Sequence, residues 1–169
     1  MGRRFAALVA AAFALAACGR SNGASATQPQ TAQVGSAAPS WSEPSIPGPT
    51  LSLASFRGKA IYLNFFATWC PPCNSEASSI DALSRAYAGR GLRVVGVDVL
   101  ESRGKAADFR SKHGLSYPVV VDDGALRNQY EVNGLPVHVF IDRAGVVRKI
   151  VVGQLSPAAM RENVERVLR

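Results

Sequence analysis

The stretch AIYLNFFATWCPPC, residues 60–73, places two cysteines directly after a continuous apolar run. The run from Ala60 to Phe66 has the length of a strand, and it is apolar enough to be buried on both faces of a sheet. After the second cysteine, apolar residues recur at helical spacing, and Pro71 suits the first turn of a helix. The stretch therefore predicts a buried strand, a short loop and a helix that begins at the cysteine pair.

Strand and helix patterns alternate through the rest of the chain. Prolines at positions 44, 47 and 49 indicate short extended pieces before the first strand, in the form of a hairpin. Further strands are expected at 92–99, 117–122, 137–142 and 146–153, and further helices at 102–114, 124–132 and 156–169. This alternation predicts an α/β fold with helices on both faces of a sheet.

The first residues have the pattern of an export signal. Arg3 and Arg4 precede an apolar run over 5–17 that is shorter than the about 20 residues needed to cross a bilayer. The run ends in Leu-Ala-Ala-Cys, which resembles a bacterial lipobox and implies cleavage before Cys18 and acylation of its thiol. An ordinary signal peptide with a stray cysteine is the alternative. We therefore expect residues 1–17 to be a signal peptide and the protein to be exported and lipid-anchored, with its domain in the periplasm or another extracytoplasmic space.

Composition separates a tether from a domain after the leader. Residues 18–40 are rich in Ser, Gly, Ala, Thr, Gln and Pro without apolar periodicity, and we expect a flexible tether there. The whole chain has 169 residues, of which 47% are hydrophobic, so residues 41–169 form one domain. The formal net charge is +7, but the basic residues are scattered, so the composition favours a solvated surface over nucleic-acid binding.

The cysteine spacing points to redox chemistry. Cys70 is expected at the N-cap of the helix, where unpaired N–H groups and the helix dipole lower a thiol pKa. Pro71 and Pro72 have no N–H, so the donor left to the Cys70 sulfur is the N–H of Cys73. A zinc site would need two more ligands, and only His113 and His138 are candidates, so we predict no metal and no cofactor. A structural disulfide over so short a loop would stabilise little.

Several segments resemble one protein family in order and spacing. LNFFATWCPPC, GLRVVGVDV, YPVVVD, YEVNGLPVHVFIDRAGVV and VGQLS are similar to the TlpA/ResA-like membrane-anchored thiol–disulfide oxidoreductases of the thioredoxin superfamily. The resemblance covers residues 35–169. It implies a thioredoxin-like fold with an N-terminal hairpin extension and an inserted βα unit before the cis-proline strand.

The resemblance also assigns roles to residues outside the cysteine pair. Pro136 matches the cis-proline that faces the cysteines and leaves the backbone of Leu135 free to pair with substrate. Glu76 matches an acidic residue that handles the proton of the second cysteine, although it could instead be a solvated helix residue. Asn64 occupies the position of a buried aspartate in thioredoxin. Trp69, with the two prolines of the motif, belongs to the supporting residues.

His138 stands where relatives have threonine. The resemblance to the thioredoxin fold implies that its strand lies beside the strand that leads into Cys70, which would place His138 near Asn64 and Cys73. A histidine there could take and return the Cys73 proton near neutral pH. A hydrogen-bonded core histidine is the alternative.

The function implied is that of a protein-disulfide reductase. Cys70 attacks a substrate disulfide and Cys73 resolves the mixed disulfide. The partners implied are exported proteins such as apocytochrome c, and a membrane electron donor that relays the reducing power of cytosolic thioredoxin. Two alternatives on the same fold are a thiol peroxidase, whose Pro-x-x-x-Thr-x-x-Cys motif is missing here, and a copper-delivery protein that would use His138.

Overall fold

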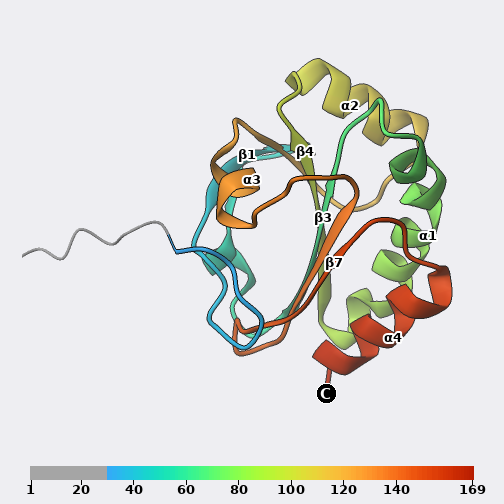
Figure 1. Ribbon diagram of the computed structural model, residues 1–169. Helices are drawn as coiled ribbons and strands as arrows, with labels where there is room; N and C mark the ends of the chain where they lie inside the picture. The colour runs from blue at the N-terminus through green and yellow to red at the C-terminus, as the bar shows by residue number, and fades with distance from the viewer. Residues whose placement is uncertain (1–29) are drawn as a thin grey trace, which may run out of the picture.

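A seven-stranded mixed sheet with helices on both faces forms the protein (Figure 1). The computed structural model describes residues 30–169, so the predicted signal peptide, Cys18 and the first part of the predicted tether lie outside the described residues. The strands are β1 Ser42–Ile46, β2 Thr50–Ser52, β3 Ala60–Phe66, β4 Leu92–Val99, β5 Val119–Asp122, β6 Val137–Ile141 and β7 Val147–Val152. The helices are α1 Pro71–Tyr87, α2 Arg103–Lys112, α3 Ala125–Gln129 and α4 Pro157–Val167, with short 3-10 turns at Leu53–Phe56 and Ala88–Arg90.

The sheet order is β2-β1-β5-β4-β3-β6-β7. β3 lies at its centre, parallel to β4 and antiparallel to β6, and all of its residues are buried. This confirms the central strand predicted from the apolar run. β6 lies beside β3, as the resemblance implied, and the register pairs Asn64 with His138.

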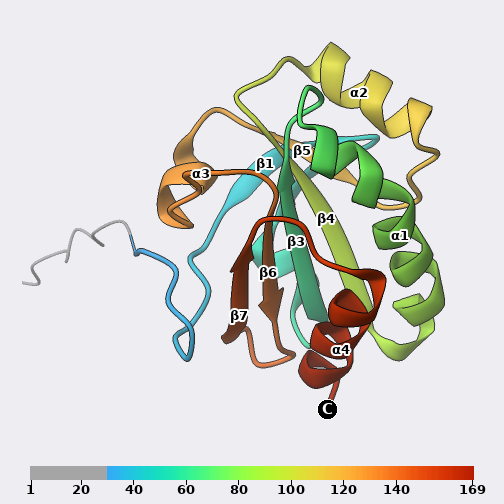
Figure 2. The same cartoon turned by 45° about the vertical axis from the view of Figure 1, so that its right-hand side comes forward.

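Two apolar layers cover the sheet. One contains both cysteines and the inner faces of α1, α2 and α4, and the other contains residues of α3 and of the chain before β1. Figure 2 shows α1, α2 and α4 on one side of the sheet and α3 on the other. Apolar burial of this kind is the main favourable contribution to folding.

The two predicted additions to the thioredoxin core are present. β1 and β2 form the N-terminal hairpin, and β5 with α3 forms the βα unit before the strand that follows Pro136. β5 joins the two additions to the core, because it pairs with β4 on one side and with β1 on the other. The Asp122 carboxylate holds the unit together by accepting the N–H groups of Leu126 at 2.9 Å and Arg127 at 2.8 Å.

The segment before β1 corrects one prediction. We expected a tether as far as residue 40, yet Ala32 and Ala38 are buried. Their N–H groups donate to the carbonyls of Gln129 and Gly145, both at 2.8 Å. The physical reason is that this segment is held by backbone hydrogen bonds and small side chains, which leave no apolar periodicity in the sequence. The ordered domain therefore includes residues 30–40, and the boundary at residue 41 is wrong.

None of the helices within 30–169 combines the length and the apolar character that crossing a bilayer requires.

Candidate active site

The cysteine pair lies at the start of α1. Cys70 is the N-cap residue, Pro71 and Pro72 occupy the first two helical positions, and Cys70 is disulfide-bonded to Cys73. The N–H of Cys73 donates to the Cys70 sulfur at 3.3 Å, which confirms the donor predicted from the two prolines. Both cysteines are buried to a similar degree, at 3% and 4% exposure, so it is the position on the helix that distinguishes them.

The loop between β3 and α1 is held by side chains from two directions. Thr68 donates to the Glu101 carboxylate through its N–H at 2.5 Å and its hydroxyl at 2.9 Å. The Asn74 amide donates to the carbonyls of Thr68 and Cys70, both at 2.9 Å. Burial alone would raise the pKa of Glu101. The hydrogen bonds that Thr68 and Lys105 donate to the charged carboxylate have the larger effect, so the pKa of Glu101 is lowered. Sequence reasoning did not identify Glu101.

A buried carboxyl group lies one turn after the second cysteine. Glu76 is 3% exposed, and its Oε1 accepts the N–H of Leu155. Its Oε2 has no hydrogen-bond partner among the described residues and lies 3.5 Å from Nε2 of His138. Burial raises the pKa of Glu76 to about 7, although the Leu155 hydrogen bond works in the opposite direction. The alternative of a solvated helix residue is therefore wrong, and Glu76 can exchange a proton near neutral pH.

His138 has a fixed tautomer. Its Nε2 lies 3.1 Å from the carbonyl of Gly153, which can only accept, so Nε2 carries the hydrogen. Its Nδ1 then accepts the hydroxyl of Tyr62 at 2.8 Å. Burial lowers the pKa of His138 to about 4, although the Gly153 hydrogen bond works against this. The structure thus favours the core-histidine alternative, because a ring that is neutral and occupied at both nitrogens is a poor acceptor for the Cys73 proton.

The cis-proline loop lies at the edge of the sheet near the cysteines, and its Leu135 packs against the apolar clusters of both faces. The Leu135–Pro136 bond is cis, as the resemblance implied. Leu135 packs against the apolar cluster that contains both cysteines. Trp69 is 70% exposed, and it lines a hollow of about 290 Å³ together with Leu135.

A second buried carboxyl group lies at the end of β4. Asp98 is fully buried, and neither of its oxygens has a hydrogen-bond partner in the described part of the chain. Burial and the charge of Glu101 raise the pKa of Asp98 to about 8. No sequence signal marked this residue, because Asp98 alternates with valines in an otherwise apolar strand.

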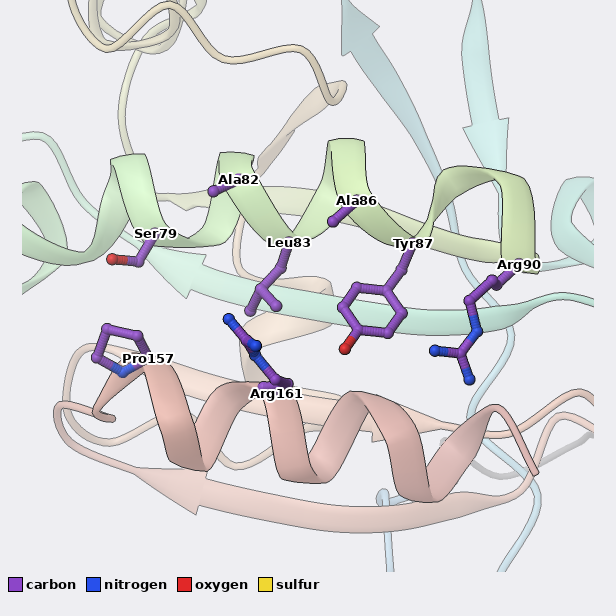
Figure 3. A pocket seen from close by; sticks show the side chains of 8 residues that line it. All are labelled: Ser79, Ala82, Leu83, Ala86, Tyr87, Arg90, Pro157 and Arg161. Atoms are coloured by element: carbon purple, nitrogen blue, oxygen red, sulfur yellow. The ribbon is translucent and has the colours of Figure 1, made fainter.

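A larger groove lies elsewhere, between α1 and α4. Figure 3 shows Leu83 and Tyr87 of α1 on one side of the groove and Arg161 and Pro157 of α4 on the other. The groove has a volume of about 470 Å³. The Tyr87 hydroxyl donates to Glu165 at 2.7 Å. The lining contains no thiol, so the redox chemistry belongs to the other end of α1.

Residues 30–169 contain no group of three or more His, Cys, Asp or Glu side chains arranged to hold a metal ion.

Comparison with known proteins identifies the family. A profile described as the AhpC/TSA family matches residues 34–150. The chain belongs to this family. Within it, the chain is 33% identical to the thiol-disulfide oxidoreductase ResA of Geobacillus thermodenitrificans over 142 residues, which are 83% of this chain and 82% of that protein. It is 31% identical to the thioredoxin-like protein YneN of Bacillus subtilis over 136 residues, 79% of each chain.

Solved structures with the same fold are thiol–disulfide oxidoreductases. The crystal structure of a thiol:disulfide interchange protein of the thioredoxin family from Chlorobium tepidum TLS is 34% identical, with a TM-score of 0.74 over 79% of this chain and 97% of that one. A secreted Mycobacterium tuberculosis disulfide oxidoreductase, homologous to Escherichia coli DsbE, is 27% identical with a TM-score of 0.68 over 75% and 95%. These matches confirm the thioredoxin-like fold and the ResA-like resemblance. The chain is a thiol–disulfide oxidoreductase.

Proposed function

We propose that this protein reduces disulfides of exported proteins at a bacterial membrane, with Cys70 as the attacking thiol and Cys73 as the resolving thiol. The observation that carries the assignment of roles is the position of Cys70 at the N-cap of α1, where its sulfur accepts the N–H of Cys73. The same N–H stabilises a thiolate at Cys70 in the reduced protein, and the helix dipole favours negative charge there.

The reaction moves two electrons from the cysteine pair to the substrate. The Cys70 thiolate attacks one sulfur of the substrate disulfide, and the other substrate sulfur leaves as a thiolate. The Cys73 thiol loses its proton to the Glu76 carboxylate, attacks the Cys70 sulfur and releases the second substrate thiolate. The two substrate thiolates take up one proton from Glu76 and one from solvent, so the substrate ends as a dithiol and the enzyme as the Cys70–Cys73 disulfide. Each cycle therefore requires a dithiol donor that reduces the enzyme again.

The wider setting of the proposal comes from the sequence and from relatives. The Leu-Ala-Ala-Cys stretch supports a lipid anchor at Cys18, and the domain would then work outside the cytoplasm. The relative from M. tuberculosis is a secreted disulfide oxidoreductase, which is consistent with that location. Exported apocytochrome c is a substrate of the expected kind, and a membrane protein that relays electrons from cytosolic thioredoxin is the donor that fits.

The reduction potential of the Cys70–Cys73 couple tests the direction of the reaction. We expect a value near the roughly −270 mV of thioredoxin, as against roughly −120 mV for a strong oxidant. Cys70→Ser should abolish reduction of insulin disulfides, and Cys73→Ser should accumulate mixed disulfides. An oxidising potential, or a Cys70→Ser variant that keeps its activity, would contradict the proposal. Peroxide turnover faster than disulfide reduction, or tight copper binding, would contradict it as well.

The anchor has a separate test. In a bacterial host, Cys18→Ala should move the exported protein from the membrane fraction to the soluble extracytoplasmic fraction. Cys18 lies outside the catalytic domain, so the purified domain beginning at residue 30 serves as the soluble reference. Unchanged membrane retention of the Cys18→Ala protein would overturn the lipid anchor and leave the catalytic proposal intact.

A further inference from the structure

Exposed apolar side chains gather at the edge of the sheet that carries the cysteines. Among the described residues, the large hydrophobic side chains that are exposed are Val34, Trp69, Leu100 and Val152. Leu100 follows the end of β4 and Val152 ends β7. Both strands run parallel to β3, so these two residues lie at the same edge as Trp69, which precedes Cys70. Such clustering is typical of a binding surface, whereas single exposed hydrophobic residues are not.

A small hollow opens within this surface. Trp69, Val99, Leu100, Val132 and Leu135 line it, and Arg127 is the charged residue in its wall. Its volume of about 290 Å³ is at the lower end of the about 300–1,000 Å³ typical of ligand pockets. The hollow therefore suits one large side chain of a peptide better than a cofactor.

Backbone strain is concentrated around the same hollow. In the described chain, the non-glycine residues with positive φ are Leu100, at 58°, and Glu131, at 50°, which precedes the lining residue Val132. Glycine or asparagine adopts this region with less strain than leucine. More than half of the Leu100 side chain lies in solvent, so burial offsets little of that strain. Strain that brings no packing benefit is characteristic of binding sites.

The backbone beside the hollow is available for pairing. Within residues 30–169, the N–H and carbonyl of Leu135 make no backbone hydrogen bond outside regular elements, and Leu135 lies in no strand. An extended peptide that paired there would project its side chains alternately toward the cysteines and toward the neighbouring surface.

We propose that Leu100 and Trp69 form a subsite for one large apolar side chain of the substrate, carried one or two positions from the cysteine that Cys70 attacks. The proposal rests on the proposed function and adds a substrate preference to it. Leu100 is then a specificity-determining residue, while the chemistry of the cysteine pair is independent of it.

The test compares three disulfides in single-turnover reactions with the reduced protein. Two are disulfide-bridged peptides of equal length and charge, with either leucine or serine on both sides of the first cysteine, and the third is 5,5′-dithiobis(2-nitrobenzoate). We expect the wild type to reduce the leucine peptide about tenfold faster than the serine peptide, which corresponds to about 1.4 kcal/mol. In Leu100→Asn, which keeps the side-chain size and suits positive φ, this ratio should fall below about threefold.

Two further variants separate binding from folding. Leu100→Gly should lose the same preference without a lower unfolding midpoint, because glycine adopts this conformation freely. Val34→Asn is the matched control, because it also removes an exposed apolar side chain. It lies beside Gly35, whose N–H donates to Val147 at the start of β7, the opposite end of the sheet from the cysteines. The Val34→Asn variant should keep the wild-type ratio.

Each of the remaining outcomes overturns either the proposed function or the subsite. If the wild type reduces none of the three disulfides, the proposed function fails and the subsite with it. If it reduces all three but shows no preference for leucine, or if Leu100→Asn keeps the preference, the subsite alone is overturned. Equal loss of rate toward all three disulfides in Leu100→Asn, or a lower midpoint in Leu100→Gly, would assign Leu100 a structural role and overturn the subsite as well.

Discussion

Glu76, one turn after Cys73 on α1, lies beside His138, and the pKa values of the two groups are displaced in opposite directions. Burial disfavours the charged form of each, so the carboxyl group keeps its proton to about pH 7 and the imidazole stays neutral down to about pH 4. The result is an uncharged pair at slightly acidic pH. Above pH 7 the carboxylate forms, and it is then the proton acceptor for Cys73 in the proposed mechanism.

Glu76 should make the stability of the oxidised protein fall as the pH rises. Its folded pKa is about 7 against the usual 4.5. The stabilising contribution of the protonated group is therefore complete below pH 4.5 and is lost as the pH rises through 7. We expect the free energy of unfolding of Glu76→Gln to exceed that of the wild type by about 1–2 kcal/mol at pH 8 and to equal it at pH 5.

Urea unfolding of the two oxidised proteins at both pH values measures this difference. Comparing variant with wild type at each pH cancels the contribution of Asp98, and His138 stays neutral at both pH values because its pKa is about 4. A gain of equal size at pH 5 and pH 8 would show that Glu76 is not buried in the protonated form.

Tyr62 should be required for the packing of His138. Tyr62→Phe leaves Nδ1 of a fully buried ring without its donor at 2.8 Å, and Asn64 at 3.4 Å replaces it poorly. We expect a loss of about 1–3 kcal/mol in the free energy of unfolding, measured in denaturant at pH 7. In a double-mutant cycle with His138→Thr the two losses should not add, since the second variant removes the acceptor. Additive losses would mean that the two rings do not interact.

At the scale of elements, the first turn of α1 determines how many donors reach Cys70. Position N2, which normally offers an N–H to an N-cap side chain, is occupied by Pro72, so only Cys73 donates. Pro72→Ala would supply a second N–H to a Cys70 thiolate. We expect the pKa of the Cys70 thiol to fall by about one unit and the reduction potential to rise by about 30 mV.

Pro71→Ala is the matched control, because an N–H at position N1 is not placed for the N-cap side chain. The pH dependence of alkylation by iodoacetamide gives the thiol pKa, and equilibration with glutathione gives the potential. Equal effects of the two substitutions would attribute the change to loop stiffness and not to the added donor.

The elements show what the sequence could and could not predict. The strands, the helices and the N-cap at Cys70 were predictable, because each depends on local periodicity or on local capping residues. That His138 lies near Asn64 followed from the family resemblance, since the order of strands in a sheet does not depend on local pattern. Glu101 was not predictable, because its role depends on a distant part of the chain, and Asp98 was missed because it alternates with valines in an apolar strand. Thr68 lies 33 residues before the carboxylate that holds it, and nothing in the sequence between them indicates that contact.

For the whole molecule, the segment before β1 should contribute to stability. It buries Ala32 and Ala38 and makes a bridge between Ala37 and Val146. A chain that begins at residue 41 should lose about 2–4 kcal/mol of unfolding free energy relative to one that begins at residue 30. Both chains should reduce a small disulfide at similar rates, because the backbone hydrogen bonds of the segment go to α3 and to the turn between β6 and β7, and not to the loop that carries the cysteines. Equal stability of the two chains would restore the boundary at residue 41.

The same segment determines which hydrogen bonds a pulling force on the N-terminal chain reaches first. A pull on the chain before residue 30 acts first on the hydrogen bonds that Ala32 makes to Gln129, and that Gly35 and Ala38 make to Val147 and Gly145. Two of these bonds are at the turn between β6 and β7, while the cysteines lie beyond the other end of β3. In a chain anchored through Cys18, as proposed above, force from the anchor would break these hydrogen bonds before it acted on the loop that carries the cysteines, and the geometry of the site would be kept.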